Sequence, residues 1–389
     1  MFEPLSKSRT GADTDRAHGG WIGDLSGAFA DLGTFLPLVI GLLVVGEVAP
    51  TGLLIGFGVF AVLTGVIYRL PMSVQPMKVV AALAIAGGLS ASAMVASGMM
   101  LGVALIILGG FGLVTRMKRL VPRTVLLGIQ FGLGLHLLVT SAAIADGALA
   151  IAASALAVLI LLQATPLRSV SCLLLLVCGI GWSLTMGKAD WVALSPAWHM
   201  PTIAMPAWSA FMEAIETVLW PQLALTLTNA VLLTSVLAAD YFPSAKHQTS
   251  TKRLALSSGA LNLFLAPIGA MPMCHGAGGL AAQYHQGARS GRAPVIFGAV
   301  CLALGLLAGP AALDWLLLVP LAIVAALLAF AGLHLMQPGR LAHLSPTCLA
   351  VIALTALTSL LVNVSVGLAA GLIAEMMRAV GKRFFQPTA

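Results

Sequence analysis

The stretches that decide the fold are Pro71-Met-Ser-Val-Gln-Pro76-Met77 and Pro267-Ile-Gly-Ala-Met-Pro272-Met273. They share the pattern P-x4-P-M, and the second copy begins 196 residues after the first in a chain of 389 residues. Proline fits the first turn of a helix and breaks its interior. We therefore predict that Pro76 and Pro272 each open a short helix, and that the chain before each of them is extended.

The chain around these stretches is strongly apolar, with 59% hydrophobic residues, 8% charged residues and a mean hydropathy of +1.02. A soluble globular protein carries roughly a quarter charged residues, so the natural solvent of this chain is a lipid bilayer. The formal net charge of +7 comes from basic residues in short loops between apolar runs, which is a signal of topology. We expect an integral protein of the cell (inner) membrane and no nucleic-acid partner.

Runs bounded by charge, proline or glycine divide the chain into fourteen apolar segments. A full span needs about 20 residues, so the third and the tenth are too short to be continuous helices. With the N-terminus inside, 18 of the 20 Lys and Arg residues fall in inside segments, which predicts fourteen spans with both termini cytoplasmic. The segments are 22–45, 50–68, 71–89, 92–114, 121–143, 147–164, 169–186, 211–239, 251–268, 269–286, 293–311, 315–335, 346–361 and 363–380.

The offset of 196 residues also places the run from Asp31 to Pro37 on the run from Leu227 to Leu233. The two copies are seven spans apart, an odd number, so they run in opposite directions, as in the inverted repeats of transporters. We predict an all-α polytopic membrane protein of two inverted seven-span repeats, with broken half-helices in spans 3 and 10. The predicted units are a cytoplasmic tail 1–20, a first repeat 21–186, an extracytoplasmic linker 187–208, a second repeat 209–382 and a cytoplasmic tail 383–389.

The two broken segments favour an anion as ligand. Five extended residues cover about 16 Å and a 13-residue helix about 20 Å, which together cross a hydrocarbon core of about 30 Å. Both short helices would then begin near the midplane, with their N-termini facing each other. A helix N-terminus presents unpaired N–H groups and about half a positive charge, so two of them form an anion site.

Ionisable residues inside the spans are functional hypotheses by default. Lys78, predicted two residues into the first short helix, either attracts a divalent anion or forms an ion pair with Asp24 or Asp31. His275, predicted at the fourth position of the second short helix, is either a group that couples transport to protons or a hydrogen-bonded core histidine. Asp24 and Asp31 lie seven residues apart on one helix face and are the other candidates for the coupling acid.

Polar and small residues in the apolar runs are further candidates. The side chains of Gln75, Gln222, Thr226 and Asn229 either donate to the oxygens of a tetrahedral anion or form hydrogen bonds between helices. The glycines of the run 276–279 either let a ligand approach the backbone or serve tight helix packing.

At these residues the chain resembles the molybdate transporter family within the sulfate permease superfamily. The resemblance extends across nearly the whole chain, and the Q-P-M-K and M-P-x-C-H-G-A-G-G strings are its most specific part. The matching stretches are Gly23-Asp24-Leu25, Asp31-Leu-Gly-Thr-Phe-Leu-Pro37, Val74-Gln-Pro-Met-Lys78, Pro221-Gln222 with Thr226 and Asn229, and Met271-Pro-Met-Cys-His-Gly-Ala-Gly-Gly279.

The resemblance implies a core domain and a gate domain, with substrate bound between spans 3 and 10 and flanked by spans 1 and 8. It also implies that Gln75 to Lys78 and Cys274 to Gly279 line the site. The candidate coupling residues remain Asp24, Asp31 and His275. The candidate substrate-binding residues are Gln75, Pro76, Met77, Lys78, Gln222, Thr226, Asn229, Cys274, His275, Gly276, Ala277 and Gly278.

The function that we expect is secondary active transport of a tetrahedral oxyanion by alternating access. Molybdate is the first candidate, with sulfate or another small anion such as bicarbonate on the same fold as the alternative, because nothing in the spacing selects size. A proton is the candidate coupling ion, and a homodimer is left open. We expect neither a metal nor a cofactor.

The same residues suit two other classes of protein. Met271, Met273, Cys274 and His275 are suitable ligand types for Cu(I), and Cys274 with His275 would suit a membrane enzyme. Neighbouring residues of a helix point about 100° apart, which disfavours both arrangements. The chain also contains neither an H-E-x-x-H nor a G-x-S-x-G string, so we expect a protein that is not an enzyme.

Overall fold

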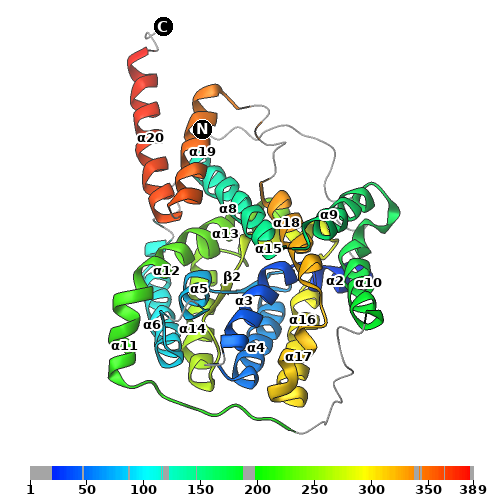
Figure 1. The fold of residues 1–389 in the computed structure, drawn as a ribbon. Coiled ribbons are helices and arrows are strands. Elements are labelled where there is room, and N and C mark those ends of the chain that lie inside the picture. The colour runs from blue at the N-terminus through cyan, green and yellow to red at the C-terminus, as the bar shows by residue number, and fades with distance from the viewer. Residues whose placement is uncertain are drawn as a thin grey trace.

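The computed structural model describes residues 20–45, 48–85, 88–114, 116, 122–145, 147–186, 198–336, 341, 344–362 and 364–385. Over these residues the chain is mostly helical, with one two-stranded sheet at its centre (Figure 1). The predicted N-terminal tail before residue 20, the part of the predicted linker before residue 198, and residues 386–389 of the predicted C-terminal tail lie outside the described residues.

In the first half of the chain, helices begin at residues that favour a helix start, such as a first-turn proline or a serine N-cap. Pro50 stands in the first turn of α4, and the Ser90 hydroxyl caps α6 by accepting from the Ala93 amide at 3.1 Å. The elements are α2 (Trp21–Ala28), α3 (Leu32–Val45), α4 (Pro50–Tyr68), β1 (Val74–Pro76), α5 (Lys78–Ile85), α6 (Ala91–Gly110), α8 (Arg123–Ile144), α9 (Leu149–Gln163), the 3-10 turn η1 (Pro166–Val170) and α10 (Ser171–Thr185).

The second half contains one long helical stretch, residues 208–241, that is interrupted by two π-helices. Its elements are α11 (Trp208–Ala214), the π-helix η2 (Ile215–Leu219), α12 (Trp220–Leu225), the π-helix η3 (Thr226–Leu233) and α13 (Thr234–Tyr241). The remaining elements are η4 (Pro243–Ala245), α14 (Thr251–Leu265), η5 (Ala266–Ile268), β2 (Met273–His275), α15 (Ala277–His285), α16 (Arg292–Ala303), η6 (Leu304–Ala308), η7 (Gly309–Ala311), α17 (Ala312–Leu316), α18 (Leu321–Met336), α19 (Pro346–Leu361) and α20 (Val364–Phe385).

Helices long and apolar enough to cross a membrane occur in both halves. Among the described residues, six stretches meet this criterion: Trp21–Leu43, Pro50–Tyr68, Ala91–Gly110, Arg123–Ile144, Gln222–Tyr241 and Arg292–Leu316. Shorter apolar helices cover Leu149–Gln163, Ser171–Thr185, Leu321–Leu333 and Pro346–Leu361. The chain is therefore an integral membrane protein, and each predicted segment contains at least one helix.

The first proline stretch is non-helical throughout, and the second becomes non-helical after η5 and Gly269. Each leads through a strand into a short helix, so the predicted breaks in the third and tenth segments are confirmed. The predicted helix starts are wrong. Pro76 lies in β1 and the helix begins at Lys78, while Pro272 precedes β2 and the helix begins only at Ala277. The reason is that the two extended stretches pair with each other, and these strand bonds satisfy backbone groups that the prediction assigned to helices.

The described helices pack in two groups. The junction bundle contains α2 to α6 and α11 to α17, and both strands lie within it; the second bundle contains α8, α9, α10, α18, α19 and α20. In Figure 1 the second bundle extends over the junction bundle, from α20 and α19 at the upper left to α9 and α10 at the right. The two bundles meet where α15 and α3 contact α18, and where α8 contacts η3.

Glycines bring helices of the two halves together within the junction bundle. A Cβ added at Gly58 of α4 would lie 2.7 Å from the Gly298 carbonyl oxygen of α16. A Cβ added at Gly102 of α6 would lie 2.7 Å from the Gly259 carbonyl oxygen of α14. Both pairs of helices are therefore held at backbone contact, which only a residue without a side chain allows.

Candidate functional site

The site centres on the pairing of the two broken segments. β1 and β2 are antiparallel, with Gln75 opposite Cys274 and Pro76 opposite Met273. The Met77 amide donates to the Pro272 carbonyl at 2.9 Å, which makes the neighbouring Pro76–Met273 pair a non-hydrogen-bonded position of the ladder. A proline is tolerated there because the ladder needs no N–H from it.

The outer edge of β2 is held by one side chain from α14. The Asn262 amide group donates to the Met273 carbonyl and accepts from the Met273 amide, both at 2.7 Å, and it also donates to the Ser258 carbonyl at 2.7 Å. Asn262 is almost fully buried. It therefore replaces a neighbouring strand and leaves neither polar group of Met273 unpaired.

A carboxylate from the turn between α2 and α3 bonds the first broken segment and lies against the start of α15. Asp31 accepts from the Ser73 hydroxyl and, at 2.8 and 2.9 Å, from the Gln75 amide nitrogen. A Cβ added at Gly276 would strike the Gln75 amide, and one added at Gly279 would strike the Ser73 hydroxyl and the Asp31 carboxylate. These glycines are therefore needed to make room for protein side chains, and the network fixes the start of α15 against β1.

The first turn of α5 is capped by Gln222 of α12, which is supported by Thr226 at the start of the π-helix η3. The Gln222 side-chain oxygen accepts from the Val79 amide at 2.9 Å, and its nitrogen donates to the Thr226 hydroxyl at 2.9 Å. The Thr226 hydroxyl lies 4.0 Å from the Met77 sulfur. Gln222 and Thr226 thus hold the β1–α5 turn and satisfy one of the amides that a helix start leaves free.

Lys78 is the first residue of α5 and is half-buried. Among the described residues no ion pair joins it to a carboxylate. The Asp24 carboxylate instead accepts from the backbone amides of Arg289 and Ser290, at 2.9 and 3.1 Å, and from the Ser290 hydroxyl at 2.6 Å. Asp24 therefore holds the loop before α16, and Asp31 is bonded to β1, so neither aspartate is the direct ion-pair partner that the sequence left open.

His275 and Cys274 are neighbours in β2, not in a helix as predicted, so their side chains point to opposite faces. His275 is fully buried, and its ring makes edge contacts with Phe60 and Tyr68 at centroid distances of 5.8 and 5.3 Å. Its Nδ1 lies 3.3 Å from the Ser73 carbonyl, and its Nε2 has no partner among the described residues.

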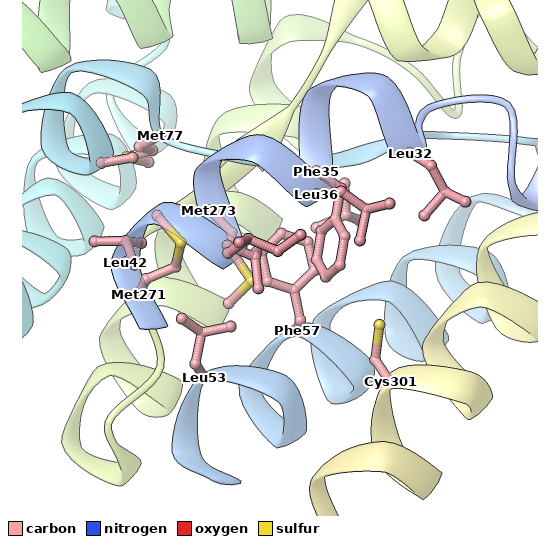
Figure 2. Close-up of a cluster of buried hydrophobic side chains, with 14 of the residues drawn as sticks. Leu32, Phe35, Leu36, Leu42, Leu53, Phe57, Met77, Met271, Met273 and Cys301 are labelled. Carbon is pink, nitrogen blue, oxygen red and sulfur yellow. The ribbon is translucent and has the colours of Figure 1, made fainter. Parts of the chain in front are cut away.

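Some of the other candidate residues lie at the paired strands and the starts of α5 and α15, and the rest lie in the surrounding core. Met77, Ala277 and Gly278 are buried at the two helix starts. Asn229 lies in η3 with its side-chain oxygen buried and without a partner among the described residues. Figure 2 shows Met77, Met271 and Met273 among apolar side chains of α3 and α4, where they serve as packing groups. No cluster of three potential metal ligands occurs in the described part of the chain.

Two residues of this network were not singled out from the sequence. Ser73 lies between the two prolines of the first stretch, and Asn262 interrupts the apolar run Leu-Asn-Leu-Phe-Leu of α14. The only signal for Asn262 is a carboxamide in an apolar helix, where a partner is required. Nothing in the sequence tells which backbone it bonds.

Solved structures of membrane transporters share this fold. The transmembrane domain of a cyanobacterium bicarbonate transporter, BicA, matches 90% of this chain and 96% of its own, with a TM-score of 0.56 and 19% identity. Murine Slc26a9, an anion transporter in its inward-facing state, matches 93% of this chain and 69% of its own, with a TM-score of 0.63 and 14% identity.

The sequence comparisons name the family. A family model described as a molybdate transporter of the MFS superfamily matches residues 23–137 and 214–335, so the chain belongs to that molybdate transporter family. Molybdate transporter 2 of Arabidopsis thaliana is 29% identical over 84% of this chain and 83% of its own length. Molybdate transporter 1 of Chlamydomonas reinhardtii is 27% identical over 90% of both chains. These relatives are transporters, as the sequence predicted for this chain.

Proposed function

We propose that this protein is a secondary active transporter of a tetrahedral oxyanion, with molybdate as its substrate. The observation that carries this proposal is the pairing of β1 with β2, which brings the starts of α5 and α15 together in the interior. The names of the relatives, which are molybdate transporters, favour molybdate over sulfate or bicarbonate.

The proposed site lies at the two helix starts. Lys78 supplies the charge, because it is half-buried and no described carboxylate neutralises it by an ion pair. The amides at the start of α15 and the carboxamide nitrogen of Asn229 in η3 are the hydrogen-bond donors in this proposal. In this proposal Gln75, Gln222 and Thr226 position the two starts, since their side chains are already bonded to the protein.

The proposed topology is the fourteen-span inverted repeat with both termini cytoplasmic. In the proposed repeat, α4 corresponds to α14 and α6 corresponds to α16. The contact of α4 with α16 should therefore have a counterpart between α14 and α6, and both contacts exist. Gly102 and Gly298, which make these contacts, are also separated by 196 residues. We assign the junction bundle as the core domain and the second bundle as the gate domain, so that transport rocks one against the other.

Coupling to protons is the remaining part of the proposal. Asp31 and His275 are the buried ionisable groups that contact both broken segments, whereas Asp24 is committed to the loop before α16. We therefore assign coupling to Asp31 or His275, and a structural role to Asp24.

The experiment that tests the function is uptake of labelled molybdate into proteoliposomes that contain the purified protein. We expect saturable uptake that a pH gradient accelerates, that excess tungstate abolishes and that bicarbonate leaves unchanged. Protein-free liposomes are the control. Uptake no faster than in those liposomes, with rapid uptake of labelled bicarbonate in the same preparation, would exclude a molybdate transporter.

A further inference from the structure

A groove of about 560 Å³ opens on the surface between the ends of α2, α4 and α16, away from the junction. Its floor is formed by Gly65 and Gly291, each of which lies against the backbone of the other. Trp21, Val66 and Val295 form an apolar wall, and the first two are exposed. The groove therefore offers apolar surface on the outside of the bundle, where lipid surrounds the protein.

Two arginines stand at this groove, Arg69 at the end of α4 and Arg292 at the start of α16. Both are exposed, and among the described residues neither guanidinium takes part in an ion pair or a side-chain hydrogen bond. By contrast, Arg123 and Arg378 each bond a carboxylate. The groove thus holds two positive charges that the described protein does not neutralise.

The backbone at Arg69 is unusual. Arg69 has φ 54° and ψ 25°, and it is the only non-glycine residue with positive φ in the described part of the chain. Its amide closes α4 by donating to the Gly65 carbonyl at 3.0 Å. Glycine is the economical residue for such a helix end, and strained non-glycine positions concentrate at ligand sites. A ligand that binds the guanidinium group would explain why an arginine and not a glycine occupies this position.

The position in the fold identifies the chemistry of a ligand. The start of α2, the end of α4 and the start of α16 lie on the side that the basic loops assign to the cytoplasm. An exposed tryptophan beside basic residues is typical of the membrane interface. A phosphate would bond the two guanidinium groups there, and an acyl chain would cover the apolar wall.

We propose that this groove is a binding site for an anionic phospholipid, with its headgroup phosphate between Arg69 and Arg292. The lipid would hold the ends of α2, α4 and α16 together at a distance from the transport site. A free phosphate ion would use the arginines alone and leave the apolar wall uncovered.

The test is native mass spectrometry of the purified full chain with phosphatidylglycerol and with phosphatidylcholine of identical acyl chains. We expect phosphatidylglycerol to bind about tenfold more tightly. The variant Arg69→Asn/Arg292→Gln should lose that preference, since asparagine accepts the left-handed backbone. Arg168→Gln/Lys252→Gln, which removes two exposed charges on the same side of the membrane, should keep it.

A second variant guards against a folding effect. Arg69→Gly removes one cation and relieves the backbone, so it should fold at least as well as the wild type and still bind phosphatidylglycerol several-fold more weakly. Equal binding of the two lipids, full preference in the double variant, or displacement of phosphatidylglycerol by millimolar inorganic phosphate would each overturn the proposal.

Discussion

Asp31 shows how one side chain organises the centre of this protein. Its carboxylate bonds Ser73 and Gln75 of the first broken segment, and Gly276 and Gly279 of the second segment fit closely around the same side chains. The sequence indicated Asp31, Gln75 and the glycines, because polar or small residues in apolar spans need a reason. It did not indicate that the glycines accommodate a neighbouring carboxamide, since that contact joins residues about 200 positions apart.

At the residue scale, Gly276→Ala should disturb this network. The added methyl group would strike the Gln75 amide and separate it from Asp31. We expect uptake of molybdate to fall by at least about tenfold, because the start of α15 would shift by a fraction of an ångström. The control is Gly181→Ala in α10, where an added Cβ meets no atom within 4 Å. Equal uptake by both variants would show that the fit around Gly276 does not matter.

The two aspartates should differ in their effect on pH dependence. Asp31→Asn removes the carboxylate at the junction, and we expect uptake in this variant to lose its acceleration by a pH gradient. Asp24→Asn removes a carboxylate that accepts from the loop before α16, so it should lower thermal stability and leave the shape of the pH profile unchanged. Uptake by reconstituted protein between pH 5 and 8 checks both, and the reverse assignment would make Asp24 the coupling acid.

At the scale of elements, the prolines predicted that two spans are broken, but they did not predict the residues at which the helices begin. The fixed φ of proline is compatible both with the first turn of a helix and with a strand. Which of the two forms depends on whether another strand pairs with the segment. The partner of β1 is β2, which local sequence does not reveal. The role of Asn262 could not be predicted for the same reason, because it bonds β2 and therefore depends on β2 lying beside α14.

Asn262→Leu should destabilise this arrangement. The substitution would leave the amide and the carbonyl of Met273 buried without partners, which costs roughly 1–3 kcal/mol for each group. We expect a clearly lower midpoint of thermal unfolding in detergent, together with reduced uptake. Thr140→Val in α8, whose hydroxyl bonds only its own helix at the surface, should change neither quantity. An unshifted midpoint for Asn262→Leu would mean that β2 does not depend on α14.

At the scale of the whole molecule, the composition and the charge pattern predicted a membrane protein, and the apolar helices and the family confirm it. The division into two bundles was implied only by the family resemblance, because it depends on which faces pack and not on the order of spans. Arg123 of α8 and Asp240 of α13 form an ion pair at 3.1 Å across the two bundles. If the bundles rock, this distance must change during transport.

A reversible cross-link tests that motion. A disulfide between Arg123→Cys and Asp240→Cys, in a background without the exposed Cys178 and the half-exposed Cys348, should stop uptake, and reduction should restore it. The control is a disulfide between Ser90→Cys and Glu213→Cys, two residues in contact within the junction bundle, which should leave uptake intact. Full transport with the first disulfide closed would rule out rocking of these two bundles.

The central claim is that the paired starts of α5 and α15 hold the anion, and the dissociation constant of molybdate tests it most directly. Calorimetric titration should compare the wild type with Lys78→Gln and with Lys252→Gln, which removes an exposed charge of α14. We predict binding at least about tenfold weaker for Lys78→Gln, because a charged contact of a half-buried side chain is lost, and unchanged binding for Lys252→Gln. A folded Lys78→Gln protein with the dissociation constant of the wild type would contradict the account.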